Sequence, residues 1–484
     1  MSRMEFVTPI IIFCTILLFV LIVFVFFAFP SGLEGSAVIT FIRSWSFSVT
    51  DIVGSVLVSL EEHFWLYIPL GLIGIWRWLT WGFKRACAEY YRPIDVEPDL
   101  PRPSLCIITP VYNENPQIFR RALDSWEANN PDEIIAVIDR SDKNCIEVYK
   151  EFSRNKKWAK LLVTAKRGKR QAIVDGVLAS NSKIVALVDS DTVWASDITQ
   201  DLLAPFSDPL IAGVTPRNHP LRRSTIWQKM TDIFWDIRNY HDLPSQTAMG
   251  SALTCLTGRT SLYRKEILLP KLDEFLNEIL LGKRKESGED KCLTRLVQRE
   301  GWKTYYQMTA VIYSAAAPDF ETFLSQRLRW TRNSHNSDLV SLLEGWVWKR
   351  RYLAFYMVDR FISTFTLFLG PIFFGVAIYL NQWVVALAIL CLWIVGRGIK
   401  IWPHLKRYPQ DLFLLPIFVA VYFLIALIKL YALVSIREQK WIRENGSNEM
   451  RHSRMRQRIH KTKDMILTTE IIGGLVILVV FVLR

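Results

Sequence analysis

The sequence predicts an α/β domain with a mainly parallel β-sheet, inserted between hydrophobic α-helical segments. Three observations lead to this prediction. Short apolar runs alternate with helix-like segments through the middle of the chain, which is the pattern of βαβ units. Long apolar runs flank this part on both sides. The composition is 51% hydrophobic with 18 Trp residues, which is high for a soluble protein that carries 22% charged residues.

Charge and cysteine usage narrow the classes of function. The 484-residue chain has a net charge of +13, and much of the excess lies beside apolar stretches, as in Lys349-Arg350-Arg351 and between Arg451 and Lys463. Positive loops that flank membrane spans lie on the cytoplasmic side, so this charge requires no nucleic-acid partner. The seven Cys form no CxxC motif and the seven His form no HExxH motif, which argues against a disulfide framework or a zinc site.

Residues 1–85 are predicted to form an N-terminal membrane region with two transmembrane helices. Phe6–Phe29 is an apolar run long enough for the ~30 Å core of a bilayer and too long for a signal peptide. Residues 31–62 are predicted to form a non-cytoplasmic loop. Phe64–Phe83 is predicted as the second span, and Lys84-Arg85 directly after it place its end in the cytoplasm.

A linker with several prolines, residues 86–103, precedes the predicted soluble domain of residues 104–340. The predicted strands are Leu105–Thr109, Ile134–Ile138, Leu161–Thr164 and Ile184–Asp189, and the predicted helices cover residues 116–128, 144–154 and 168–179. Ligands of open α/β sheets bind beyond the carboxyl ends of the strands, so the residues that follow these strands are site candidates.

Residues 341–484 are predicted to form interfacial helices and the C-terminal transmembrane helices. Leu342–Phe355 interleaves aromatic with basic residues, which favours an amphipathic interfacial helix. The predicted spans are Phe361–Leu380, Trp383–Gly396 and Met465–Leu483. Leu412–Val434 is also long enough to cross, but crossing would place nine Lys/Arg residues outside. An interfacial or re-entrant segment containing Pro416 is therefore favoured there.

Two carboxylates, Asp189 and Asp191, follow the apolar run Ile184–Val188 with D-x-D spacing. At the carboxyl end of a buried strand, such a pair can hold a divalent cation together with substrate phosphates. Acidic turn residues are the alternative interpretation.

Polar residues also end two other predicted strands. Thr109 ends the first strand, and a turn then presents Tyr112 and Glu114, while Asp139 ends the second strand. An ordinary βα turn explains each feature alone, but together with the D-x-D they place several polar groups at one sheet edge.

Two later stretches add candidate chemistry. In Gly288-Glu289-Asp290, the adjacent carboxylates can repel each other and raise one pKa toward use as a general base, whereas the alternative is an acidic helix N-terminus. Gln326, Arg329 and Trp330 lie at i, i+3 and i+4, hence on one helical face. Arg suits diphosphate oxygens and Trp offers a flat apolar platform, although a packed amphipathic helix would show the same spacing.

The order D, DxD, (T/G)ED and QxxRW between predicted spans resembles the membrane-embedded processive family 2 glycosyltransferases, which include the hyaluronan, chitin and cellulose synthases. The resemblance covers residues of about 104–335. The matching residues are Asp139, Asp189, Asp191, Glu289, Asp290, Gln326, Arg329 and Trp330. Cys255–Arg264, with Gly258 and Arg259, resembles the acceptor-side segment of the hyaluronan and chitin synthase branch, and Lys169 resembles its basic donor-site position.

The resemblance implies a GT-A-type nucleotide-sugar-binding domain and assigns roles within it. The implied donor-binding residues are Thr109, Tyr112, Glu114, Asp139, Lys169, Asp189 and Arg329. The implied acceptor or polymer contacts are Gln326, Trp330, Gly258 and Arg259. The implied metal ligands for Mg²⁺ or Mn²⁺ are Asp189 and Asp191, and the implied catalytic pair is Asp290, as base, with Glu289.

The implied function is processive, inverting polymerisation from a UDP-sugar, with export of the polysaccharide through the enzyme's own transmembrane channel. The implied partners are the UDP-sugar, the growing polysaccharide and the lipid bilayer, and the implied location is the cell membrane, multi-pass, with a cytoplasmic catalytic domain. Two alternatives stay open: a non-processive membrane glycosyltransferase that adds one sugar to a lipid carrier, and a non-catalytic membrane scaffold or transporter.

Overall fold

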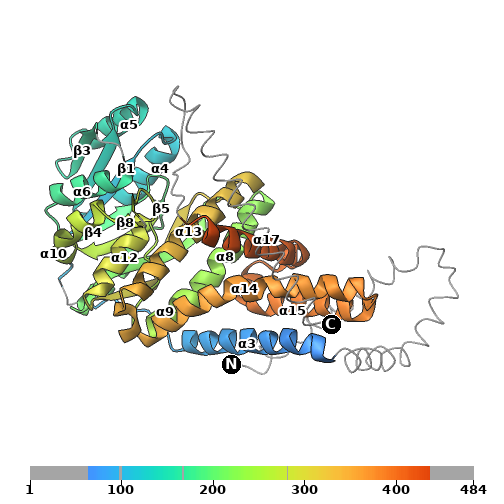
Figure 1. The fold of residues 1–484 in the computed structure, drawn as a ribbon. Coiled ribbons are helices and arrows are strands. Elements are labelled where there is room, and N and C mark those ends of the chain that lie inside the picture. Colours follow the sequence, from blue (N-terminus) through green and yellow to red (C-terminus); the bar gives the residue numbers. More distant parts are fainter. Residues whose placement is uncertain (1–63, 98–100, 166–167, 281, 437–484) are drawn as a thin grey trace. The chain divides into compact units, whose positions relative to one another are not determined.

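The computed structural model describes residues 64–97, 101–165, 168–280 and 282–436 (Figure 1). The predicted first span, the loop after it and the predicted last span, Met465–Leu483, lie outside the described residues. The described chain divides into two compact units. The larger contains residues 81–362 and 428–436, and the smaller contains residues 64–80 and 363–427.

An eight-stranded sheet in the order β3-β2-β1-β4-β7-β6-β10-β5 forms the centre of the larger unit. Its strands are β1 (Leu105–Val111), β2 (Glu133–Asp139), β3 (Ala159–Thr164), β4 (Ile184–Val188), β5 (Val193–Trp194), β6 (Ile211–Pro220), β7 (Thr260–Arg264) and β10 (Lys303–Ser314). Strands β1 to β4 pair in parallel, as do β6 and β10. Strand β7 is antiparallel to β4 and β6, and β5 is antiparallel to β10. The predicted mainly parallel sheet is thus confirmed.

The first half of this unit follows the predicted βα order closely. The four predicted strands are β1 to β4, and the three predicted helices are α4 (Pro116–Glu127), α5 (Lys143–Ser153) and α6 (Lys169–Ala179). Helix α6 packs close to the sheet at Gly176, which has no side chain. A Cβ at this position would lie only 2.3 Å from Ile108 Cγ2 on β1. This close approach brings the first residue of α6 to the edge where β4 ends.

Two apolar layers, one on each face of the sheet, hold the larger unit together. Helices α4, α5 and α7 (Ile198–Leu203) cover one face, where Phe119 and Trp126 are fully buried. Helices α6, α11 (Leu272–Leu276) and α12 (Glu289–Arg299) cover the other, where Phe275 is fully buried. Burying each such side chain contributes about 1.5–3 kcal/mol. The Trp126 indole also donates to the carbonyl of Thr192 (2.9 Å), which ties α4 to the turn after β4.

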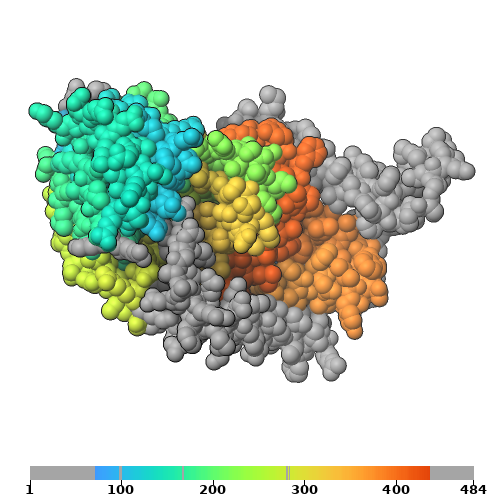
Figure 2. All heavy atoms as spheres, turned by 90° about the horizontal axis from the view of Figure 1, so that it is seen from above, coloured from blue at the N-terminus to red at the C-terminus, as the bar shows by residue number. Residues whose placement is uncertain are grey.

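Further helices and turns of the larger unit lie between or after the later strands in the chain. They are α8 (Ile226–Ile237), a π-helical turn (Arg238–Asp242), α9 (Leu243–Ala248), α10 (Lys265–Leu268), α13 (Phe320–Leu343), the hairpin β8 (Ile279–Leu280) and β9 (Lys283–Arg284), and the 3₁₀ turns Ala204–Ser207 and Leu269–Lys271. Helices α8 and α13 lie side by side, green and yellow in Figure 2, and the Trp227 ring packs at a tilt of 41° against that of Phe320, with ring centroids 4.7 Å apart.

Helix α3 (Phe64–Glu89) begins where the second span is predicted but continues past Phe83 into the predicted linker. Lys84 is not an exposed positive flank, because it is buried and its ammonium lies 2.6 Å from the carboxylate of Asp359. Within the predicted linker, Tyr91 attaches the chain to β10, since its hydroxyl donates to the carbonyl of Tyr306 (2.8 Å).

Three helical segments among the described residues are long and apolar enough to cross a membrane. They are α14 (Arg351–Tyr379), α15 (Trp383–Lys400) and Pro409–Val434, which joins a 3₁₀ turn (Pro409–Leu414) to α17 (Leu415–Val434); the short α16 (Trp402–Arg407) precedes the third. Helix α3, which carries Arg77, is not one of the three.

One prediction for the C-terminal region is corrected. The interfacial helix predicted over Leu342–Phe355 is not a single helix, because the chain turns at Gly345 (φ +79°), a 3₁₀ turn follows (Trp346–Lys349), and α14 takes up the remainder. The interfacial or re-entrant segment over Leu412–Val434 stays a prediction. There α17 is continuous, Pro416 lies in its first turn, where proline is tolerated, and the segment is also long and apolar enough to cross.

Candidate active site

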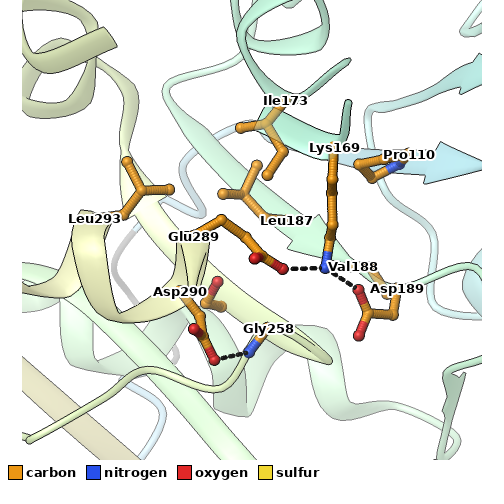
Figure 3. A pocket seen from close by; sticks show the side chains of 11 residues that line it. Pro110, Lys169, Ile173, Leu187, Val188, Asp189, Gly258, Glu289, Asp290 and Leu293 are labelled. Atoms are coloured by element: carbon orange, nitrogen blue, oxygen red, sulfur yellow. Dashed lines mark hydrogen bonds and ion pairs between the residues drawn. The ribbon is translucent and has the colours of Figure 1, made fainter. Parts of the chain in front are cut away.

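A pocket at the carboxyl edge of β1 and β4 gathers residues from five separate parts of the chain (Figure 3). It is lined by Pro110, Lys169, Ile173, Leu187, Val188, Asp189, Gly258, Ser261, Glu289, Asp290 and Leu293. Five of these residues are candidates selected from the sequence, namely Lys169, Asp189, Gly258, Glu289 and Asp290. The structure therefore brings the D-x-D, the Glu-Asp pair and the basic position of α6 to one place, as ligand sites of open α/β sheets require.

Lys169 is the central cation of this pocket. It is the first residue of α6, and its ammonium lies 2.6 Å from Asp189 Oδ1 and 2.5 Å from Glu289 Oε1 (Figure 3). Burial would lower the pKa of Lys169, but the two carboxylates more than offset burial and raise it. The side chain is therefore a permanent positive charge between two acids that lie far apart in the sequence.

The pKa of Glu289 differs from the prediction. Burial would raise it, but the neighbouring charge of Lys169 lowers it to about 2, so repulsion from the adjacent Asp290 does not decide its protonation. Glu289 is also the first residue of α12, where a negative charge is favoured by the helix dipole. The pair therefore begins a helix, as the alternative interpretation had it, and it also lines the pocket, while the use of one of its carboxylates as a general base stays a prediction.

Asp290 faces the segment that precedes β7. The backbone N–H of Gly258 donates to Asp290 Oδ2 at 3.4 Å, and the backbone N–H of Lys291 donates to Oδ1 at 2.8 Å (Figure 3). A Cβ on Gly258 would lie 3.6 Å from Asp290 Oδ2, in ordinary contact. Asp290 therefore has a carboxylate oxygen at the pocket wall and is not engaged by Lys169.

Asp191 is the carboxylate whose pKa is raised. Burial, followed by the charges of Asp189 and Glu114, raises the pKa of Asp191 to about 6. Ser190, between the two acids, donates from its hydroxyl to Glu114 Oε2 (2.9 Å), which attaches the turn after β4 to the loop after β1. Asp191, whose charge is poorly compensated, and the nearby Asp189, which is paired with Lys169, together form a donor set that fits a hard divalent cation.

Four predicted donor residues at the ends of β1 and β2 do not line the pocket. Thr109 has no exposed surface, and its hydroxyl has no hydrogen-bond partner. Tyr112 is 42% exposed. Asp139 accepts hydrogen bonds from the backbone N–H (2.9 Å) and hydroxyl (2.6 Å) of Ser141. Glu114 reaches the D-x-D turn through Ser190, as described above.

Gln326, Arg329 and Trp330 lie on α13, as predicted, but none of them lines the pocket. Their link to it is Arg259, whose guanidinium carbon lies 5.1 Å from the centre of the Trp330 ring and 4.4 Å from that of Trp235. Burial lowers the pKa of Arg259, although Asp189 and Asp191 act in the opposite direction. Arg259 thus connects the acceptor-side segment, the D-x-D and α13.

Sequence reasoning missed two further features near α13 and β6. Arg327 lies 5.3 Å from the Trp330 ring, and burial together with the charge of Arg259 lowers its pKa to about 9. His219, Asp232 and Asp236 bring three metal-capable atoms within 4.8 Å of one another, while Arg223 pairs with Asp232 at 2.6 Å. No short sequence motif marks this group, because His219 lies near the end of β6 whereas Asp232 and Asp236 lie on α8.

Comparisons with known proteins agree with this fold. Residues 101–333 match the family model described as glycosyltransferase like family 2. An N-acetylglucosaminyltransferase of Rhizobium meliloti is 26% identical over 405 residues, covering 78% of this chain and 92% of the relative. A hyaluronan synthase of Streptococcus pyogenes is 24% identical over 403 residues, covering 80% of this chain and 94% of the relative.

A solved structure extends the agreement to the fold. A mannosyltransferase from Pyrobaculum calidifontis, in complex with GDP-Man and Mn²⁺, superposes with a TM-score of 0.50 at 16% identity and covers 77% of this chain and 98% of its own. At this identity the likeness concerns the GT-A fold alone. The family match and the synthase relatives together indicate a glycosyltransferase whose residues 101–333 form a domain similar to family 2 enzymes of the synthase type.

Proposed function

We propose that this chain is a processive, inverting glycosyltransferase that polymerises sugar from a UDP-sugar and exports the polysaccharide through a channel formed by its transmembrane helices. The observation that carries the proposal is the meeting of Lys169, Asp189, Glu289 and Asp290 in one pocket. These groups are what the transfer of a sugar from a diphosphate requires: positive charge for the leaving group, acids for a cation, and a base for the acceptor.

On the donor side, Asp189 and Asp191 would hold the cation, Mg²⁺ or Mn²⁺. A bound divalent cation would neutralise charge on the diphosphate as it leaves. Lys169 would bind the same diphosphate oxygens in competition with its two carboxylate partners, and Arg329 would add positive charge to the donor site. Tyr112, Glu114 and Asp139 would hold the nucleoside at the ends of β1 and β2, whereas Thr109 is fully buried.

On the acceptor side, Asp290 is the better candidate for the general base. Glu289 is held as a carboxylate by Lys169, and a carboxylate with a pKa of about 2 is a weak proton acceptor. Asp290 is free of that ion pair, and its Oδ2 lies at the pocket wall beside Gly258. It would take the proton from the acceptor hydroxyl as that oxygen attacks the anomeric carbon.

Trp330 would stack on the acceptor sugar, with Gln326 alongside and Arg259 holding the indole from the pocket side. The membrane arrangement is proposed to place residues 104–340 in the cytoplasm, between the membrane regions 1–85 and 341–484. The apolar helices α14, α15 and α17 support membrane insertion, and a protein-lined channel would keep the polar polymer away from lipid.

The test is to incubate the purified full chain, in detergent or nanodiscs, with single UDP-sugars and with pairs of them, while UDP release and product size are measured. Cation-dependent UDP release with a product of many sugars supports the proposal. A single sugar added to a lipid carrier would instead support the non-processive enzyme, and polymer synthesis that EDTA leaves unchanged would contradict the cation role of Asp189 and Asp191.

A further inference from the structure

Beneath the pocket, Glu278 is the centre of a buried ionic network that no sequence motif marks. Glu278 lies between α11 and β8, and only 9% of it is exposed. Its Oε2 accepts from Arg170 Nη2 at 2.7 Å, and its Oε1 accepts from Arg295 Nη2 at 2.8 Å. The ammonium of Lys285 lies 3.8 Å from the same Oε1.

Both arginine partners of Glu278 belong to helices that carry pocket residues. Arg170 follows Lys169 in the first turn of α6. Arg295 is on α12, whose first two residues are Glu289 and Asp290. A single buried carboxylate thus joins the two helices whose N-termini form the Lys169–Glu289 ion pair.

The network continues on both sides of Glu278. Arg170 also donates to the carbonyl of Phe275 (2.6 Å) and approaches that of Ser287 (3.4 Å), two residues before Glu289. Arg295 also donates to Glu344 Oε1 (2.7 Å), and Glu344 is the residue directly after α13. The helix that carries Gln326 and Trp330 is therefore connected through Arg295 to the helix that carries Asp290.

Glu278 itself lies outside the pocket, so it touches no reacting group. We propose that Glu278 is a positioning residue, which holds α6, the segment before Glu289, α12 and the end of α13 in the alignment that sugar transfer requires. This inference rests on the proposed roles of Lys169, Glu289 and Asp290.

Physical considerations favour positioning over simple stabilisation. A buried ion pair is a poor source of stability, because desolvation offsets most of the attraction, and an apolar replacement is often no less stable. A satisfied buried network does restrict geometry, and a displacement of about 1 Å at a reacting centre can lower a rate about 10²-fold. The charges of Lys285, Arg170 and Arg295 overcome burial and lower the pKa of Glu278 to about 2, so the network stays ionised throughout the working range of pH.

The chain offers a matched control. Glu274, on α11, also pairs with an arginine of α12, since its carboxylate lies 2.5 Å from Arg299 Nη2. That pair is partly exposed, and in the part of the chain that the structure describes it has no ion pair with Arg170 or α6, although Arg299 also lies 3.8 Å from Glu344. Glu278→Gln and Glu274→Gln therefore remove the same charge from the same region, and only the first breaks the network.

The experiment measures kcat and KM for the UDP-sugar that the wild-type chain uses, with active sites counted by UDP titration. Glu278→Gln is expected to lower kcat per UDP-binding site about 10- to 100-fold, with KM changed less than threefold, and Glu274→Gln to stay within twofold of wild type. If Glu278→Gln gives no folded protein, Arg170→Lys is the second variant. It keeps the positive charge but cannot bind both Phe275 and Glu278 as the guanidinium does, so it is also expected to lower kcat with little change in KM.

Two results would overturn the inference. One is a loss of UDP-binding sites in proportion to the loss of activity, because Glu278 would then only stabilise the fold. The other is equal behaviour of Glu278→Gln and Glu274→Gln. Failure of the proposed function is distinguishable from both, since the wild-type chain itself would then turn over no UDP-sugar.

Discussion

The ammonium of Lys169 lies 2.5 Å from a carboxylate oxygen of Glu289, and this ion pair joins the first residue of α6 to the first residue of α12. Two helix N-termini therefore face one pocket, and each favours negative charge. Within the chain itself, that charge comes from Glu289 and Asp189. A donor diphosphate would compete with them for Lys169, so donor binding and the state of Glu289 are coupled.

We expect Lys169→Met to lower kcat/KM for the donor about 10²- to 10³-fold, because the leaving diphosphate would lose a preorganised positive charge. Steady-state UDP release under saturating cation measures this change. Lys183→Met, which removes an exposed lysine just before β4, is the control and should behave as wild type. A Lys169→Met enzyme with normal kcat/KM would show that this cation only balances Glu289 and Asp189.

Neutralising Glu289 and neutralising Asp290 should have different effects on the enzyme. Asp290→Asn is expected to lower sugar transfer at least about 10²-fold while UDP binding persists, because the base is lost but the donor site is not. Glu289→Gln is expected mainly to change donor affinity, because it releases Lys169 from its ion pair.

The measurement is single-turnover transfer together with UDP titration, and Glu286→Gln, an exposed neighbour, is the control. If Asp290→Asn retained polymer synthesis while Glu289→Gln lost it, the assignment of the base would have to be reversed.

The first half of the domain could be predicted from sequence because its signals are local. Runs such as Ile134–Ile138 are apolar, β-branched and bounded by turn residues, and the structure confirms β1 to β4 with bounds that differ by at most two residues. Strands β6 and β10 escaped prediction for the opposite reason. Strand β6 contains Gly213 and Pro216, and β10 carries Lys303 and a register shift against β6, so neither shows a clean period.

The site was predictable where a residue's role depends on its own strand end or helix start, as for Asp189 and Asp290. It was not predictable where two distant charges meet. Lys169 was selected only by resemblance, and nothing in the sequence indicates that it bridges Asp189 and Glu289 or lowers the pKa of Glu289. The carboxylate with the raised pKa is Asp191 and not a member of the Glu-Asp pair. Its pKa depends on burial and on nearby acidic side chains, and both are set by the fold.

Trp330→Ala should impair elongation far more than donor hydrolysis, because the indole is proposed to carry the acceptor sugar. The relevant measurement is the ratio of polymerised sugar to free sugar released at equal UDP production. Trp330→Phe keeps an aromatic ring beside Arg259 and should retain part of the elongation. Trp348→Ala is the control, since that side chain is 56% exposed. Equal losses of elongation and hydrolysis would argue that Trp330 only packs α13.

Asp191→Asn should stabilise the cation-free protein at pH 8 while it abolishes cation-dependent activity. The pKa of Asp191 is about 6 in the folded state against 3.8 for an ordinary Asp, so between these values the folded state binds more protons than the unfolded state. Stability from this group therefore falls as pH rises from about 4 to about 6, and the loss, of about 1–3 kcal/mol, persists at higher pH.

Thermal unfolding in EDTA at pH 8 and at pH 4 measures this effect, with the exposed Asp95→Asn as control. The midpoint of Asp191→Asn should exceed that of wild type by a few degrees at pH 8 and match it at pH 4, where Asp191 is protonated in the folded protein. Added Mn²⁺ should raise the wild-type midpoint and leave that of Asp191→Asn unchanged, because only the wild type would offer both carboxylates. If the variant were less stable than wild type at pH 8, the negative charge of Asp191 would be compensated by other groups of the protein. The D-x-D turn would then offer no uncompensated carboxylate to a cation.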